Sequence, residues 1–247
     1  MSLRDAIVGR VHAVLHSDAV FRRRFPDVEP RIREIYARAK PFTMTSPERV
    51  IALCDAVRYV VSAGVEGAIV ECGVWRGGSS MAAALMLAEL GETGRDLYLF
   101  DTFEGMSEPG EEDRRARDAT GAAALLASSG RDAKVWAYSP LDEVRANLAS
   151  TGYPAERVRF VQGKVEDTIP EHAPDRIALL RLDTDWYEST RHELEHLYPR
   201  LVPGGVLIID DYGAWEGARR AVDEFVAAGA KLLLNRIDET GRIGVRL

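Results

Sequence analysis

Five acidic side chains stand at or directly after the ends of apolar segments that alternate with helical patterns: Glu71, Asp101, Asp183, Asp210 and Asp211. Apolar segments joined by helices form parallel strands, and consecutive strands are usually neighbours about 4.8 Å apart. We therefore expect Asp183 to lie close to Asp210 and Asp211. Carboxylates at such short range repel one another unless a proton or a cation lies between them.

A hard divalent cation such as Mg²⁺ prefers carboxylate oxygens and keeps coordination positions open for a substrate. It can chelate two neighbouring substrate oxygens and lower the pKa of a hydroxyl group. The sequence thus predicts a Mg²⁺ site formed by Asp183, Asp210 and Asp211. Asp183 could also accept the proton that leaves the hydroxyl.

The segment ECGVWRGGSS, residues 71–80, predicts a glycine-rich turn between a strand and a helix, with Ser79 or Ser80 as the helix cap. Its spacing matches neither a P-loop nor the dinucleotide fingerprint. Asp101, at the end of the second strand, can accept hydrogen bonds from both ribose hydroxyls of a nucleoside. Glu71 would repel a pyrophosphate but would suit the ammonium and sulfonium charges of S-adenosylmethionine. Asp101 alone would fit either NAD or S-adenosylmethionine, and the charge of Glu71 favours the methyl donor.

Near-continuous apolar strands alternating with helices are typical of a parallel sheet with helices on both faces. We expect strands at 68–71, 97–100, 158–162, 177–182, 206–209, 231–235 and 243–247. We expect helices at 47–63, 79–90, 140–149, 187–201 and 216–228, with a mobile loop or irregular helix at 104–130. The sequence thus predicts an α/β fold with a mostly parallel seven-stranded sheet. Residues 64–247 would form the single core domain, and residues 1–63 a helical cap.

The composition narrows the classes of partner. The chain has 247 residues and a formal net charge of −7, with its arginines dispersed among acids, so we expect no nucleic-acid partner. No stretch of roughly 18 apolar residues occurs, so we expect no membrane span. Cys54 and Cys72 lie in apolar surroundings and are expected to be buried and reduced, which favours a cytoplasmic protein.

A competing metal motif lies in the segment HELEH, residues 192–196, which matches the HExxH pattern of zinc proteases. Glu216 could supply a third ligand. We expect instead that this helix packs on the flank of the sheet through its leucines, with His192 and His196 directed to solvent. The zinc site is kept as an alternative.

Four segments in order resemble the macrocin O-methyltransferase family: ECGVWRGGSS, FDTFEGM, RLDTDWYEST and PGGVLIIDDYGAWEGARRAVDEF. The preceding PFTMTSPER is similar to the segment that this family carries before its core, so the resemblance spans about residues 41–228. It implies a Rossmann-like class I methyltransferase fold that uses S-adenosylmethionine and Mg²⁺. It also implies a small-molecule acceptor, a sugar hydroxyl of a glycosylated natural product such as an antibiotic.

The resemblance further implies roles for individual residues. Asp183, Asp210 and Asp211 would bind the metal, and Asp183 would be the catalytic base. The loop after the third strand flanks the adenine in such sheets and would contribute Gly163, Val165 and Glu166. The other donor-binding residues would be Thr43, Met44, Glu71, Gly73, Ser79, Asp101 and Asp183.

The acceptor itself stays open. Trp186 stands where the family pattern has leucine, and the 104–130 segment has its own charge pattern. A catechol-type acceptor would chelate the cation in the same way as a sugar. A binding module for S-adenosylmethionine that has lost turnover is a further alternative. The N-terminal helical segment could mediate self-association into a homo-oligomer.

Overall fold

The structure, a computed structural model, describes residues 19–247. These residues form one seven-stranded sheet. Its strands are β1 (Ala68–Cys72), β2 (Leu97–Asp101), β3 (Val158–Gln162), β4 (Ile177–Leu182), β5 (Leu201–Ile209), β6 (Leu232–Arg236) and β7 (Arg242–Arg246). They lie in the order β3-β2-β1-β4-β5-β7-β6, and β7 runs antiparallel to both of its neighbours. The predicted mostly parallel seven-stranded sheet is therefore confirmed.

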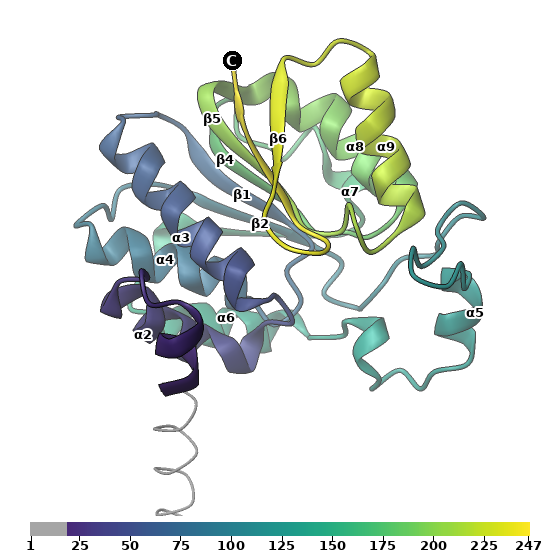
Figure 1. The fold of residues 1–247 in the computed structure, drawn as a ribbon, viewed down its shortest axis with the longest axis horizontal. Coiled ribbons are helices and arrows are strands. Elements are labelled where there is room, and N and C mark those ends of the chain that lie inside the picture. Colours follow the sequence, from purple (N-terminus) through teal and green to yellow (C-terminus); the bar gives the residue numbers. More distant parts are fainter. Residues whose placement is uncertain (1–18) are drawn as a thin grey trace, which may run out of the picture.

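Helices cover both faces of this sheet (Figure 1). One face carries α2 (Pro30–Ala39), α3 (Pro47–Ser62), α4 (Gly78–Glu89) and α6 (Leu141–Ala149). The other face carries α7 (Val165–Thr168), α8 (Tyr187–Leu197) and α9 (Glu216–Ala227). In Figure 1, α5 (Ala122–Ala127) lies apart from both layers, to the right. Short 3₁₀ turns occur at Lys40–Phe42, Lys134–Trp136, Ala155–Arg157 and Tyr198–Arg200.

Local sequence explains where two of these helices begin. The Arg49 amide donates to the Ser46 hydroxyl (3.2 Å) and Pro47 takes the first helical position, so the predicted start of α3 is confirmed. The expectation that Ser79 or Ser80 caps α4 is wrong. That helix begins one residue earlier, after Gly77, whose φ of 86° lies in the left-handed region.

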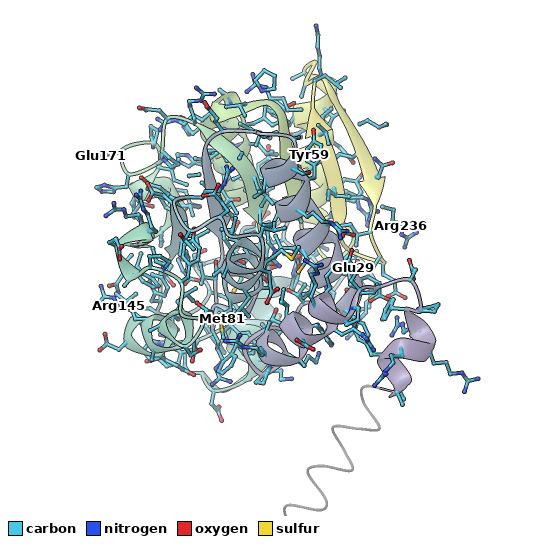
Figure 2. The ribbon with its side chains drawn as sticks, turned by 90° about the vertical axis from the view of Figure 1, so that its left-hand side faces the viewer. Glu29, Tyr59, Met81, Arg145, Glu171 and Arg236 are labelled. Carbon is cyan, nitrogen blue, oxygen red and sulfur yellow. The ribbon has the colours of Figure 1, made fainter. Side chains whose placement is uncertain are left out.

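Two apolar clusters fill the space on either side of the sheet. One cluster joins buried residues of α2 and α3 to those of α4 and the strands, and the other lies under α8 and α9. In Figure 2, Arg145, Glu171 and Arg236 lie at the rim of the molecule, whereas Met81 of α4 is 2% exposed. Since α2 and α3 share a core with the sheet, they pack as part of the same body. The division at residue 63 stays a prediction, and residues 1–18 lie outside the described part.

The largest remaining differences between the observed and the expected elements lie in three places. The 104–130 segment contains α5 and two isolated antiparallel bridges, Arg114 with Gly121 and Arg115 with Trp215. β5 begins before its predicted start at 206, because the strand continues through a Pro-Gly-Gly stretch that is typical of a turn. α8 ends at Leu197 and a 3₁₀ turn follows. No helix within residues 19–247 is both long and apolar enough to cross a membrane.

Candidate active site

The carboxyl ends of the central strands meet at one edge of the sheet, where a cavity of about 370 Å³ lies. The parallel register places Leu182 of β4 beside both Cys72 of β1 and Ile209 of β5. The residues that follow continue this pairing: the Asp183 amide donates to the Cys72 carbonyl (2.8 Å), and the Asp210 amide donates to the Leu182 carbonyl (2.9 Å). The adjacency of these two strand ends, expected from the sequence, is confirmed.

Nearly all residues predicted to bind the donor or the metal lie on the wall of this cavity. They are Thr43, Met44, Gly73, Ser79, Asp101, Gly163, Val165, Glu166, Asp183, Asp210 and Asp211. Glu71 is the exception. It is 4% exposed, Arg181 Nη1 donates to its Oε1 (2.6 Å), and the Ser80 hydroxyl donates to its Oε2. The structure thus places Glu71 away from the cavity wall, and its direct contact with a donor stays a prediction.

A group of three carboxylates on this wall belongs to Asp183, Asp185 and Asp211. One oxygen from each lies within 4.8 Å of the other two. Oδ2 of Asp211 is buried, and no atom of the described residues forms a hydrogen bond with it. An unpartnered buried oxygen beside two further carboxylates is a donor set that suits a hard divalent cation. The group therefore fits Mg²⁺, with Asp185 where the sequence analysis placed Asp210.

Burial disfavours the charged form of these acids. It raises the pKa of Asp211 and of Asp183 well above their ordinary range, and neighbouring carboxylates add to both shifts, while Arg181 acts against the shift at Asp183. Burial also raises the pKa of Asp185 to about 7, with a further contribution from Asp183. A cation among these oxygens would favour their charged forms.

Asp210 takes part in an ion-pair network beside that group. Arg181 Nη2 donates to its Oδ1 (2.7 Å), and Arg49 Nη1 donates to its Oδ2. Arg49 also pairs with Asp238 through Nε (3.0 Å). Because both oxygens of Asp210 are held by arginines, its predicted role as a metal ligand stays a prediction.

The turn after β1 packs against the loop that carries the acids. Gly73 has a φ of 80°, and a Cβ there would lie 2.5 Å from the carbonyl carbon of Asp183, so glycine is required at this position. The carboxylate of Asp101 accepts hydrogen bonds from the amides of Val74 (2.6 Å), Trp75 (3.0 Å) and Phe103 (2.7 Å). Asp101 thus holds the glycine-rich turn, and its contact with a ribose stays a prediction.

The segment 42–45 lies across the start of α4 and lines the cavity. A Cβ at Gly78 would lie 2.6 Å from the Phe42 carbonyl carbon, so this close approach depends on glycine. Met44 is 46% exposed, which leaves its side chain available to a ligand. Thr45 is buried, and its hydroxyl accepts a hydrogen bond from Arg181 Nη2 (3.0 Å). The 42–45 segment is therefore fixed at Phe42 by its close approach to Gly78 and at Thr45 by the hydrogen bond from Arg181.

Residues 104–137, which we call the lid, supply a further part of the cavity wall through Gly105, Met106, Ser107, Lys134, Val135 and Ala137. Asp113 is 1% exposed and accepts a hydrogen bond from the amide of Tyr187 (2.8 Å), the first residue of α8. Trp186 is buried, donates to the Ser107 carbonyl (3.1 Å) and packs edge-on against Trp215 (ring centroids 4.9 Å apart). The tryptophan that departs from the family pattern therefore anchors the lid.

The HExxH segment lies on α8, and its histidines are not part of the acidic group. His192 Nε2 is 2.9 Å from the Ile169 carbonyl oxygen, and both histidines are half-buried rather than fully directed to solvent. Glu193 is fully buried and accepts a hydrogen bond from the Thr184 hydroxyl (3.0 Å). Within residues 19–247, the acidic group described above is the one cluster of potential metal ligands, and it contains no histidine.

Sequence reasoning missed three residues of the site: Asp185, Arg181 and Arg49. Two of them left a signal. Asp185 follows Asp183 by two residues at a strand end, and Arg181 is an ionisable residue inside an otherwise apolar strand. Arg49 lies in the first turn of α3 and looks in the sequence like an ordinary helix-surface residue.

Comparisons with known proteins identify the family and the fold. The family described as Macrocin-O-methyltransferase (TylF) matches residues 10–243. The 8-demethyl-8-(2,3-dimethoxy-alpha-L-rhamnosyl)-tetracenomycin-C 4'-O-methyltransferase of Streptomyces olivaceus is 38% identical over 223 residues, which cover 87% of this chain and 80% of that protein. Mycinamicin III 3''-O-methyltransferase of Micromonospora griseorubida is 34% identical over 183 residues, which cover 74% of this chain and 69% of that protein.

Among solved structures, the O-methyltransferase NovP superposes with a TM-score of 0.72 at 33% identity, covering 83% of this chain and 82% of its own. The fold is thus the predicted Rossmann-like class I methyltransferase fold, and the family match extends over the N-terminal helices as well as the sheet. The chain therefore belongs to the macrocin O-methyltransferase family and is an O-methyltransferase.

Proposed function

We propose that the protein transfers the methyl group of S-adenosylmethionine to a hydroxyl of a glycosylated natural product, with Mg²⁺ as cofactor. The observation that carries this proposal is that one cavity contains both the strand ends expected to hold a nucleoside and the Asp183–Asp185–Asp211 group. The names of the two relatives above specify a rhamnosyl tetracenomycin and mycinamicin III as acceptors, which supports a sugar-bearing substrate.

The charge of the cavity supports a cationic donor. Six carboxylates belong to residues on its wall: Asp101, Glu166, Asp183, Asp185, Asp210 and Asp211. The basic residues on the wall are Arg49, Lys134 and Lys164. An acid-rich cavity attracts a sulfonium and a divalent cation and disfavours a pyrophosphate. Glu71 does not belong to this wall, and its carboxylate is paired with Arg181.

The residues of the chain would act in sequence. Asp101 and the 42–45 segment would orient the donor, with the sulfonium methyl directed toward the acids. Asp183, Asp185 and Asp211 would hold Mg²⁺, which would make the acceptor hydroxyl more acidic. Asp183 would take the proton as the oxygen attacks the methyl carbon from the side opposite the sulfur, and Asp185 is a second carboxylate within reach. The lid would keep water from the site.

Calorimetric titration with S-adenosylmethionine tests the donor assignment, with Asp101→Ala and Asp183→Ala as the two variants. We expect binding in the micromolar range that is lost in Asp101→Ala and kept in Asp183→Ala. Methyl transfer to a panel of rhamnosides and catechols, with and without EDTA, then tests the acceptor and the cation. Binding without transfer to any acceptor, unchanged by Mg²⁺, would support the non-catalytic module, and no binding by folded protein would refute the proposal.

Cytoplasmic localisation and self-association stay predictions.

A further inference from the structure

Arg181 is a charged residue near the carboxyl end of the buried strand β4, and it connects four separate parts of the site. Its side chain is 3% exposed. Nη1 donates to Glu71 Oε1 (2.6 Å) and to Asp183 Oδ2 (2.8 Å). Nη2 donates to Asp210 Oδ1 (2.7 Å) and to Thr45 Oγ1 (3.0 Å). One guanidinium group thus touches β1, the loops after β4 and β5, and the 42–45 segment.

A buried guanidinium is costly unless hydrogen bonds and opposite charges compensate for its lost hydration. Here three carboxylates do so, and Arg181 in turn supplies an opposite charge to each of these acids. The planar fork of arginine can serve several acceptors in fixed directions, whereas a lysine ammonium on a flexible stem cannot reproduce that geometry. The arrangement therefore depends on arginine and not only on positive charge.

The contact with Asp183 bears on the cation site. Because Nη1 holds Oδ2 of Asp183, the orientation of this carboxylate is set before any cation binds. The contact with Thr45 bears on the donor side, since Thr45 belongs to the 42–45 segment on the same cavity wall. A shift of Asp183 on cation binding would be transmitted through the guanidinium to Thr45, and a shift of Thr45 would be transmitted in the opposite direction.

We propose that Arg181 is a positioning residue that orients Asp183 for the cation and couples the cation site to the 42–45 segment. The inference rests on the proposed function, because it concerns how the two ligands of that site influence each other. Coupling between two bound ligands is reciprocal. The factor by which the cation changes the affinity for the donor therefore equals the factor by which the donor changes the affinity for the cation. The 42–45 segment and the acids thus behave as one binding unit.

Three variants test this proposal, and all readouts are binding measurements. Arg181→Lys keeps the charge and removes the fork, Thr45→Val removes one hydroxyl at nearly constant volume, and Thr45→Ser restores it. Arg191→Lys is the control for arginine replacement, because Arg191 forms two exposed ion pairs on α8, with Glu188 and Glu195. The probes are Mn²⁺, followed by electron paramagnetic resonance, and S-adenosylhomocysteine, followed by calorimetry. The uncharged sulfur of the latter removes direct repulsion between the two ligands.

In the wild type we expect Mn²⁺ to change the affinity for S-adenosylhomocysteine by about fivefold or more. Thr45→Val should bring that factor close to one, and Thr45→Ser should restore it. Arg181→Lys should weaken Mn²⁺ binding by about 10- to 100-fold, as expected when a residue that orients a ligand is lost. Arg191→Lys should change neither affinity.

Wild-type levels of Mn²⁺ binding in a folded Arg181→Lys variant would overturn the orienting role. A Thr45→Val variant that keeps the full coupling factor, or a wild type without coupling, would overturn the connection between the sites. If circular dichroism shows that Arg181→Lys does not fold, the coupling factors of Thr45→Val and Thr45→Ser test whether the two sites are connected. If the wild type binds neither probe, the proposed function fails; if it binds both without coupling, only this inference fails.

Discussion

Gly73 is the point at which the turn after β1 contacts the acid-bearing loop after β4, so Gly73→Ala tests the geometry of the proposed cation site. The added methyl group would lie closest to the Asp183 carbonyl oxygen, 2.5 Å from its carbonyl carbon and 3.2 Å from the Thr184 amide nitrogen. Non-bonded carbons are at ease at about 3.5 Å or more, so the loop must shift by roughly 1 Å. Metal–ligand distances tolerate deviations of only about 0.2 Å. We therefore expect Gly73→Ala to weaken Mn²⁺ binding by about 10- to 100-fold.

The same substitution also has a conformational cost, because the φ of Gly73 is 80°. A residue with a Cβ in the left-handed region loses about 1–2 kcal/mol. Gly91→Ala is the matched control: its φ is 71°, and no atom lies within 4 Å of the added Cβ. It should lower the melting temperature by about 2–4 °C per kcal/mol, as expected for a chain of this size.

Thermal melting and Mn²⁺ titration of both variants separate the two effects. Gly91→Ala should melt earlier than the wild type and bind Mn²⁺ normally, whereas Gly73→Ala should melt earlier and bind Mn²⁺ poorly. Equal Mn²⁺ affinity in the two variants would refute the reasoning, because it would mean that the position of the β4 loop does not determine the cation site.

Four further predictions follow from the described contacts. Burial raises the pKa of Asp185 to about 7, so between about pH 4 and pH 7 the cation-free folded state binds more protons than the unfolded state. The melting temperature of the cation-free protein should therefore fall as the pH rises through this window, and it should fall less steeply in Asp185→Asn. A melting temperature that rises with pH would contradict this pKa. Asp101→Ala leaves three backbone amides without their acceptor and should both lower the melting temperature and abolish S-adenosylhomocysteine binding in calorimetry. Asp113→Ala should release residues 104–137, which trypsin would then cleave several-fold faster, and unchanged cleavage would show that Asp113 does not anchor them. His196→Ala should leave metal content and donor affinity unchanged, whereas loss of bound zinc would revive the HExxH interpretation.

The adjacency of Asp183 and Asp210 was predictable because it depends only on the order of the strands along the chain. Two consecutive apolar strands joined by a helix form a parallel pair, so the residues after them meet at one edge. Most strand positions were predictable because the apolar runs are bounded by polar turns, and β5 is the exception because its first residues include a Pro-Gly-Gly stretch.

The composition of the acidic group was less accessible, because it depends on side-chain direction within a few residues of loop. Asp185 has a φ of 69°, a left-handed conformation that strand or helix periodicity does not indicate, and it lies with Asp183 and Asp211. Asp210, one residue before Asp211, instead meets Arg49 and Arg181. Glu71 was assigned to the donor from its charge and from the family resemblance, and only the structure shows that Arg181 from the neighbouring strand pairs with it.

The lid has a consequence for how this family can diversify. It leaves the sheet after β2, returns at α6, and is anchored at the starts of α8 and α9 by Asp113, Trp186 and the bridge between Arg115 and Trp215. No strand of the sheet passes through it. Insertions, deletions or grafts within residues 104–137 can therefore change this part of the cavity wall while the residues at the strand ends keep their register.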